Sequence, residues 1–160
     1  DPSLARAVLN LAGVASGDRV LDPMCGTGGL LIEAGLLGAR PIGLDAQLKM
    51  VRGTRENLRA ALGGSPLVAR GDGTALPLPD GAVDAVVFDA PYGRQSKIAT
   101  HDLETLVGGA LAEARRVGSR AVVVADRASD ALAREAGWEV SARYERRVHR
   151  SLVRHVHVLR

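Results

Sequence analysis

Two loops of this chain carry residues whose types and spacing suit chemistry. In the first, the tetrapeptide Asp89-Ala90-Pro91-Tyr92 follows an apolar run at residues 83–88. A tyrosine directly after an acid and a proline is poorly placed for a core and well placed to stack on a planar ligand. The second loop, residues 22–29, reads Asp-Pro-Met-Cys-Gly-Thr-Gly-Gly. Together the loops predict a nucleotide-like cofactor and a planar substrate that meet at one edge of a sheet.

The glycine loop favours a cationic cofactor. Gly26 and Gly28 let the backbone turn sharply and approach a ligand closely. A dinucleotide site would need a third glycine at position 31, which is Leu31, and the opening Asp22 would repel a pyrophosphate. These features disfavour a nicotinamide-dependent dehydrogenase. S-adenosylmethionine carries an ammonium and a sulfonium without phosphate, and it fits Asp22 better; an ordinary turn or helix-capping acid is the alternative.

Two further acids follow predicted strands. Asp45 lies 23 residues after Asp22, where an acid can accept hydrogen bonds from both ribose hydroxyls. Its alternative role is the N-cap of the helix that follows. Asp72 follows the third strand, where it could accept from an adenine amino group or could only form an Asx-turn in Gly-Asp-Gly. Right-handed crossovers bring all such strand ends to one edge of a parallel sheet, so we expect these acids to converge there.

The loop after residue 88 suits the methylation of an exocyclic amine. The lone pair of such an amine is delocalised into the base, so acceptors that face its two N–H bonds would make it more nucleophilic. The Asp89 carboxylate and the Ala90 carbonyl can form that acceptor pair, while Pro91 fixes the turn. Tyr92 can stack on the base and align it with the methyl group. The alternative is a plain strand-end turn with a surface tyrosine.

Alternating helical and strand patterns predict an α/β fold that positions these loops. Five strands should be parallel, and the last two should form an antiparallel hairpin, which makes a mostly parallel seven-stranded sheet. The expected helices cover residues 4–14, 30–37, 48–62, 103–117 and 129–136. The expected strands cover residues 18–21, 41–44, 67–70, 83–88, 121–125, 138–147 and 152–159.

Composition limits the class of protein. The 160 residues suit one domain with an aliphatic core, because 46% of them are apolar and only four are aromatic. No apolar run suggests a membrane span or signal peptide, so we expect a cytoplasmic protein. A lone cysteine, Cys25, excludes an intrachain disulfide and suggests a packed loop residue rather than a metal ligand. The net charge is +3, but residues 143–160 hold six arginines against one acid, which suits either a phosphate backbone or a solvated edge strand.

The sequence resembles the class I S-adenosylmethionine-dependent methyltransferases, which have a Rossmann-like fold. More narrowly, it is similar to the catalytic domain of the archaeal tRNA guanine-N2 methyltransferases that act on guanosine 10. The similarity rests on five segments: DPMCGTGGLLIEAG at 22–35, GLDAQLKMVRGTRENL at 43–58, GDGTALPLP at 71–79, FDAPYGRQS at 88–96 and HRSLVRHVHVL at 149–159.

The resemblance implies roles for particular residues. Asp89, Ala90, Pro91 and Tyr92 would position the target guanine, and Arg94 could touch a phosphate. The implied S-adenosylmethionine site comprises Asp22, Pro23, Cys25, Gly26, Thr27, Gly28, Asp45, Ala46, Asp72, Gly73 and Asp89. No metal is implied. The product would be N2-methyl- or N2,N2-dimethylguanosine in tRNA.

Two departures from the family pattern bear on function. The catalytic turn usually has two prolines, and here Ala90 replaces the first, which keeps the carbonyl but loosens the turn. Relatives also carry an N-terminal RNA-binding THUMP domain. We expect residues 1–160 to be the methyltransferase domain alone, with weak tRNA binding. Alternative readings are methylation of guanine in rRNA or adenine in DNA, or a non-catalytic module that binds cofactor or RNA.

Overall fold

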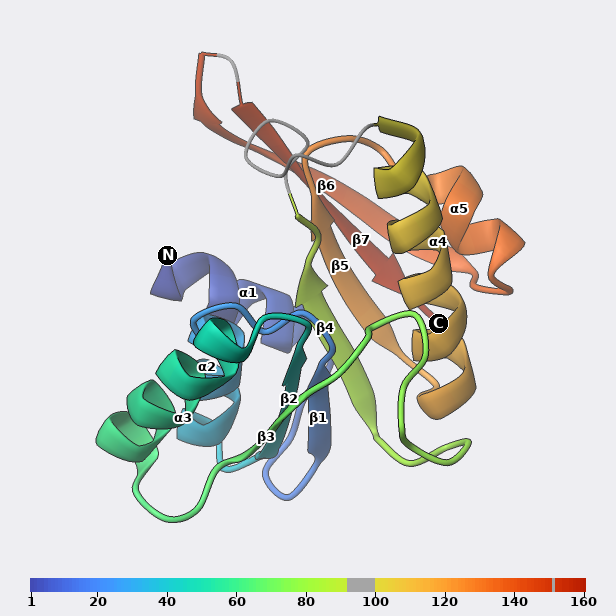
Figure 1. The fold of residues 1–160 in the computed structure, drawn as a ribbon. Coiled ribbons are helices and arrows are strands. Elements are labelled where there is room, and N and C mark those ends of the chain that lie inside the picture. Colours follow the sequence, from blue (N-terminus) through green and yellow to red (C-terminus); the bar gives the residue numbers. More distant parts are fainter. Residues whose placement is uncertain (92–99, 151) are drawn as a thin grey trace.

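The computed structural model describes residues 1–91, 100–150 and 152–160, and it shows one sheet between two layers of helices (Figure 1). The strands are β1 (Arg19–Asp22), β2 (Arg40–Asp45), β3 (Leu67–Arg70), β4 (Ala85–Asp89), β5 (Ala121–Ala125), β6 (Val140–His149) and β7 (Leu152–Leu159). The helices are α1 (Pro2–Leu11), α2 (Gly29–Leu36), α3 (Leu48–Leu62), α4 (Thr100–Val117) and α5 (Asp130–Glu135).

The sheet has seven strands in the order β3-β2-β1-β4-β5-β7-β6. The first five strands pair in parallel, whereas β7 runs antiparallel to β5, and β6 runs antiparallel to β7. This topology confirms the predicted mixed sheet with its final hairpin. The chain order reverses direction between β1 and β4, which is the place where open parallel sheets bind ligands.

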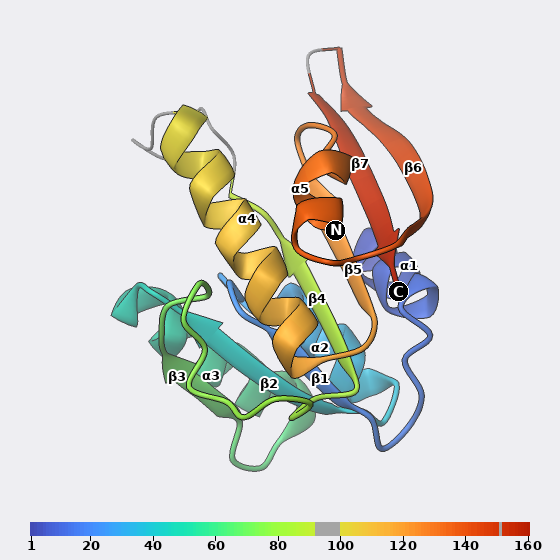
Figure 2. The same cartoon turned by 90° about the vertical axis from the view of Figure 1, so that its right-hand side faces the viewer.

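Apolar side chains on both faces of the central strands explain why these strands lie in the middle. β4 and β5 are almost continuous runs of valine, alanine and phenylalanine, as expected for strands covered on both sides. Helices α1, α2 and α3 cover one face, and α4 and α5 cover the other (Figures 1 and 2). Phe88 is fully buried on the α4 side.

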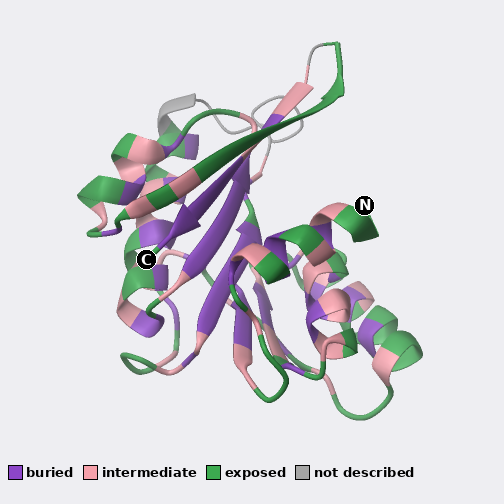
Figure 3. Cartoon of the chain, turned by 180° about the vertical axis from the view of Figure 1, so that it is seen from behind, coloured by how far each residue is buried: buried purple, intermediate pink, exposed green. Residues whose placement is uncertain are grey.

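β6 differs from the central strands because it is an edge strand and is exposed along most of its length (Figure 3). Its outer row of backbone groups faces no other strand of the described sheet. β6 begins at Val140, not at the predicted residue 138. Gly137 turns the chain with a φ of 87°, and Trp138 then packs into the core, where its Nε1 donates to the Leu111 carbonyl at 2.9 Å. Similarly, α1 ends at Leu11 and not at residue 14, because Gly13 adopts a φ of 66°.

Candidate active site

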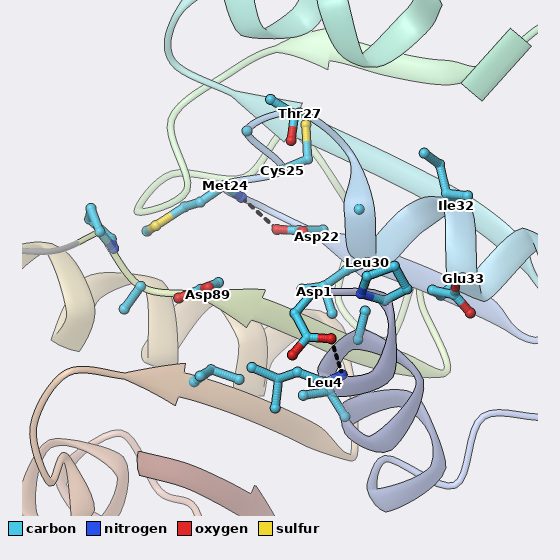
Figure 4. A pocket seen from close by; sticks show the side chains of 18 residues that line it. Asp1, Leu4, Asp22, Met24, Cys25, Thr27, Leu30, Ile32, Glu33 and Asp89 are labelled. Atoms are coloured by element: carbon cyan, nitrogen blue, oxygen red, sulfur yellow. Dashed lines mark hydrogen bonds between the residues drawn. The ribbon is translucent and has the colours of Figure 1, made fainter. Parts of the chain in front are cut away.

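A cavity of about 460 Å³ opens at the carboxyl ends of β1 and β4 (Figure 4). Asp22 ends β1 and Asp89 ends β4, and both side chains line this cavity. The two strands pair directly, with Leu21 opposite Val86. The glycine loop forms a second wall, and Asp1 with the first turn of α1 forms a third. The structure therefore brings the two predicted loops to one pocket.

Helix α3 holds the glycine loop in shape. The Thr54 hydroxyl donates to the Gly26 carbonyl at 2.5 Å, and the Asn57 side chain donates to the Thr27 carbonyl at 2.9 Å. Gly28 has a φ of 86°, and a Cβ at this position would lie 2.8 Å from Thr54 Cγ2. Glycine is therefore needed both for the left-handed backbone and for the close approach of α3.

Asp22 is a buried acid with few groups around it that stabilise its negative charge. The residue is only 2% exposed, and its described hydrogen bond comes from the Met24 N–H at 3.0 Å. Burial is the main reason that its pKa rises to about 8, and the negative charges of Asp89 and Asp45 add to the shift. A cation in the pocket would stabilise the ionised form of this acid. This acidic acceptor thus fits the ammonium of an amino-acid-like ligand better than it fits a phosphate.

Asp45 lies beside the cavity but points into the glycine loop. Its Oδ2 accepts from the Gly26 N–H at 3.0 Å, and its Oδ1 accepts from the Gln47 N–H at 2.9 Å. Neighbouring Ala46 accepts from Arg70 Nε through its carbonyl at 3.0 Å. Neither Asp45 nor Ala46 lines the cavity itself. The observed role of Asp45 is to connect the end of β2 to the loop.

Asp72 forms an Asx-turn, which was the alternative that the sequence left open for it. Its Oδ1 accepts from both the backbone N–H and the hydroxyl of Thr74, at 2.8 and 2.7 Å. These bonds lower the pKa of the exposed carboxyl. Its neighbour Gly73 packs against the glycine loop, since a Cβ there would lie 3.1 Å from the Pro23 carbonyl oxygen. The turn therefore borders the glycine loop without lining the described cavity.

Cys25 is a buried loop residue, as predicted. Its backbone N–H donates to the Leu44 carbonyl at 2.8 Å, and its Sγ lies 3.8 Å from Thr54 Oγ1. Burial, with a contribution from the charge of Asp22, raises the pKa of the thiol to about 12. The thiol is consequently protonated and poorly nucleophilic at neutral pH.

Asp89 forms an ion pair with Arg154 of β7. The Asp89 side chain opens toward the cavity and is 44% exposed, whereas the Arg154 side chain is 2% exposed. The pKa of Asp89 is raised, because burial of the strand end outweighs the opposing effect of the Arg154 charge. Arg154 reaches Asp89 from β7, which is separated from β4 by β5.

The turn after Asp89 is partly described. Ala90 is buried, its N–H donates to the Val124 carbonyl at 2.8 Å, and both Ala90 and Pro91 line the cavity. Tyr92 and Arg94 lie outside the described residues, so their predicted stacking and phosphate-binding roles stay predictions.

Sequence reasoning missed three residues that shape the site: Thr54, Asn57 and Arg154. Thr54 and Asn57 are three residues apart on one helix, so they share a face, but nothing in their types says what that face touches. Arg154 offered a clearer signal, because it interrupts the apolar residues of a predicted strand. A buried arginine needs an acidic partner, and Asp89 supplies it.

Two features are absent from the described residues. These residues contain no group of three histidine, cysteine, aspartate or glutamate side chains arranged to bind a metal ion. They also contain no helix that is long and apolar enough to cross a membrane.

The fold and pocket define the class I methyltransferase type of α/β domain. One solved structure of this type, TrmN from Thermus thermophilus, is 26% identical with a TM-score of 0.82, over 99% of this chain and 48% of that one. Magnesium protoporphyrin IX methyltransferase from Synechocystis, solved with bound SAM, is 19% identical with a TM-score of 0.74, over 99% of this chain and 77% of that one. This second likeness supports the fold alone.

Residues 1–156 match the family described as "RMKL-like, methyltransferase domain", and the chain belongs to that family. Among curated proteins, the tRNA (guanine(10)-N2)-dimethyltransferase of Methanothermobacter thermautotrophicus is 42% identical. The match covers 99% of this chain and 48% of that relative. The chain therefore spans about half the length of this relative.

Proposed function

We propose that this domain transfers a methyl group from S-adenosylmethionine to the exocyclic N2 amine of guanosine 10 in tRNA. One observation carries the proposal: Asp22 and Asp89, from neighbouring strand ends, line one pocket between the glycine loop and the Ala90–Pro91 turn. The name of the archaeal relative supports guanosine 10 of tRNA as the target.

The cofactor end of the pocket is built for a cation. S-adenosylmethionine supplies an electrophilic methyl group when it is bound. Ionised Asp22 would accept hydrogen bonds from the ammonium of the cofactor, which would relieve the cost of burying this carboxylate. Asp45 would bind the ribose hydroxyls from the edge of the pocket. Each of its carboxylate oxygens already accepts one backbone N–H, from Gly26 or Gln47, and would use its remaining lone pair. The backbone from Gly26 to Gly28 would allow the cofactor to approach closely, because glycine has no Cβ.

The substrate end of the pocket is built for an amine. The Asp89 carboxylate and the Ala90 carbonyl would accept hydrogen bonds from the two N–H groups of the guanine amine. The nitrogen would take the methyl carbon as the carbon–sulfur bond breaks, which leaves S-adenosylhomocysteine. The nitrogen would then lose one proton, which Asp89 can accept or pass to water. Arg154 contacts Oδ1 of Asp89, so Oδ2 is the oxygen that we assign to the amine. Arg154 is thus a positioning residue that also favours the ionised state of Asp89.

The test is methyl transfer from radiolabelled S-adenosylmethionine to an unmodified tRNA transcript, followed by nucleoside analysis. The parent chain should form N2-methylated guanosine, and a transcript with adenosine at position 10 should not be labelled. Asp89→Ala should lower kcat by roughly 100-fold or more, the typical range for losing a group that assists proton transfer. Unchanged affinity for S-adenosylhomocysteine would show that this variant keeps its fold.

Several results would contradict the proposal. Label in methyladenosine, or equal label in the position-10 variant, would assign another base. Binding of NAD in place of S-adenosylhomocysteine in calorimetry would remove the methyltransferase assignment. Cofactor binding without transfer to any RNA, at protein concentrations well above micromolar, would favour a non-catalytic module.

A further inference from the structure

The hairpin of β6 and β7 continues beyond the rest of the sheet on the side of the pocket (Figure 1). The last β5 residue, Ala125, pairs with His155 of β7. Three more pairs follow between β6 and β7 alone: Arg146 with Arg154, Arg147 with Val153, and His149 with Leu152. We call residues 146–150 and 152–154 the arm. Because these pairs lie past the end of β5, the arm projects from the same sheet edge that carries Asp89.

The arm is strongly basic. Residues 146–154 contain four arginines and one histidine, and no acid. Arg146, Arg147, Val148, His149 and Arg150 are all exposed. Such a density of positive charge on a protruding ribbon is typical of a surface that attracts polyanions. A polyanion that lies along the arm would be attracted by these exposed charges.

Two ion pairs fix the base of the arm to the rim of the pocket. Arg154 contacts Asp89, and Arg146 Nη2 donates to Asp1 Oδ2 at 2.6 Å. Both acids line the cavity. A two-stranded ribbon is only marginally stable in water, so these contacts give the arm a defined position. Anything bound along the arm is therefore held beside the pocket.

The outer arginines remain available. The guanidinium groups of Arg147 and Arg150 have no hydrogen bond or ion pair with any described residue, and both residues are exposed. From Arg146 to Arg150 the chain advances at most about 14 Å, at about 3.4 Å per residue. A strand with the phosphate spacing of duplex DNA, about 3.4 Å per nucleotide along the axis, presents about four phosphates over this length. At the base, Tyr144 is 52% exposed and offers a ring on which a base could stack.

We infer that the arm is an RNA-binding surface, in which Arg147 and Arg150 contact the phosphate backbone beside the nucleotide that enters the pocket. The inference rests on the proposed function for the choice of RNA. The arm supplies positioning and not sequence recognition, because guanidinium–phosphate contacts carry no direct sequence information. It also gives the isolated domain an RNA contact of its own.

The test compares a double variant of the arm with a control of equal charge. Arg147→Gln with Arg150→Gln removes the two outer charges. Arg59→Gln with Arg134→Gln is the control, since both of these arginines are exposed on helices α3 and α5. Binding of a fluorescent unmodified tRNA transcript is measured by anisotropy between 50 and 200 mM KCl. S-adenosylhomocysteine affinity is measured for all three proteins and should be equal.

The arm variant should lower the slope of log affinity against log salt by about 2, at about one unit per lost phosphate contact. The control should keep the parent slope, and methyl transfer by the arm variant should show a raised KM with kcat nearly unchanged. Equal slopes for the two variants, or a parent that binds tRNA without salt dependence, would overturn the inference. So would phosphatidylserine vesicles that displace the RNA from the arm. A chain that binds RNA through the arm but methylates nothing would refute the proposed function alone.

Discussion

Asp22 should make cofactor binding depend strongly on pH. Its pKa in the folded protein is about 8, against an ordinary value of 3.8, because the carboxyl is buried. The proposed cofactor ammonium needs the ionised carboxylate. Below pH 8 the acid must lose a proton before it binds, which weakens the affinity by up to tenfold per pH unit. Between pH 8 and pH 6 the Kd of S-adenosylhomocysteine should therefore rise by up to about 100-fold.

Titration calorimetry at pH 6, 7 and 8 measures this effect, with Asp22→Asn as the matched variant. The variant should bind weakly and with a Kd that changes little over the same range, because its amide does not titrate. A parent Kd that is constant from pH 6 to pH 8 would refute the reasoning. An equal pH dependence in the Asn variant would assign the proton to another group, of which Asp89 is the nearest candidate.

The same raised pKa predicts an opposite effect on stability. The folded state binds the Asp22 proton more tightly than the unfolded chain does, so this contribution is present below pH 4 and is lost as pH rises through about 8. The loss is at most about 6 kcal/mol, at about 1.4 kcal/mol per pKa unit. Urea unfolding at pH 8 should find Asp22→Asn more stable than the parent, with a smaller difference at pH 5. A variant less stable than the parent at pH 8 would contradict the assigned burial cost.

Three further changes test other parts of the site. Arg154→Met should slow methyl transfer at pH 7 and move the acidic limb of the pH–rate profile to higher pH, because it removes the positive charge that Asp89 pairs with. Arg154→Lys should partly restore the rate and the profile. A profile that does not move would contradict the positioning role of Arg154. Asp45→Ala should weaken S-adenosylhomocysteine binding by roughly tenfold in calorimetry, through lost hydrogen bonds and a loosened Gly26, and an unchanged affinity would remove Asp45 from the site. Gly28→Ala should lower the free energy of unfolding in a urea titration by at least about 1–2 kcal/mol, because position 28 has a φ of 86° and a Cβ there would contact Thr54. Gly29→Ala is the control in the same titration, since a Cβ at position 29 would meet no atom within 4 Å.

The sequence by itself determined most of the architecture. The alternation of helical and strand periods predicted the α/β class, and the strand ends at Asp22, Asp45 and Asp89 were predicted to within one residue. Such predictions succeed because periodicity reports which faces are buried, and because parallel strands must end at a common edge. Boundaries moved where a single glycine turned the chain, as at Gly13 and Gly137.

Only the tertiary structure decided which of the candidate acids share the pocket. All of them lie at or just after strand ends, but Asp22 and Asp89 line the cavity, whereas Asp45 and Asp72 do not. The partner of Asp89 was equally hidden, because Arg154 lies 65 residues away in the chain and reaches it across β5. A residue type and its neighbours in sequence specify what a side chain can bind. Its partner and its pKa depend on which distant strands the core brings alongside it.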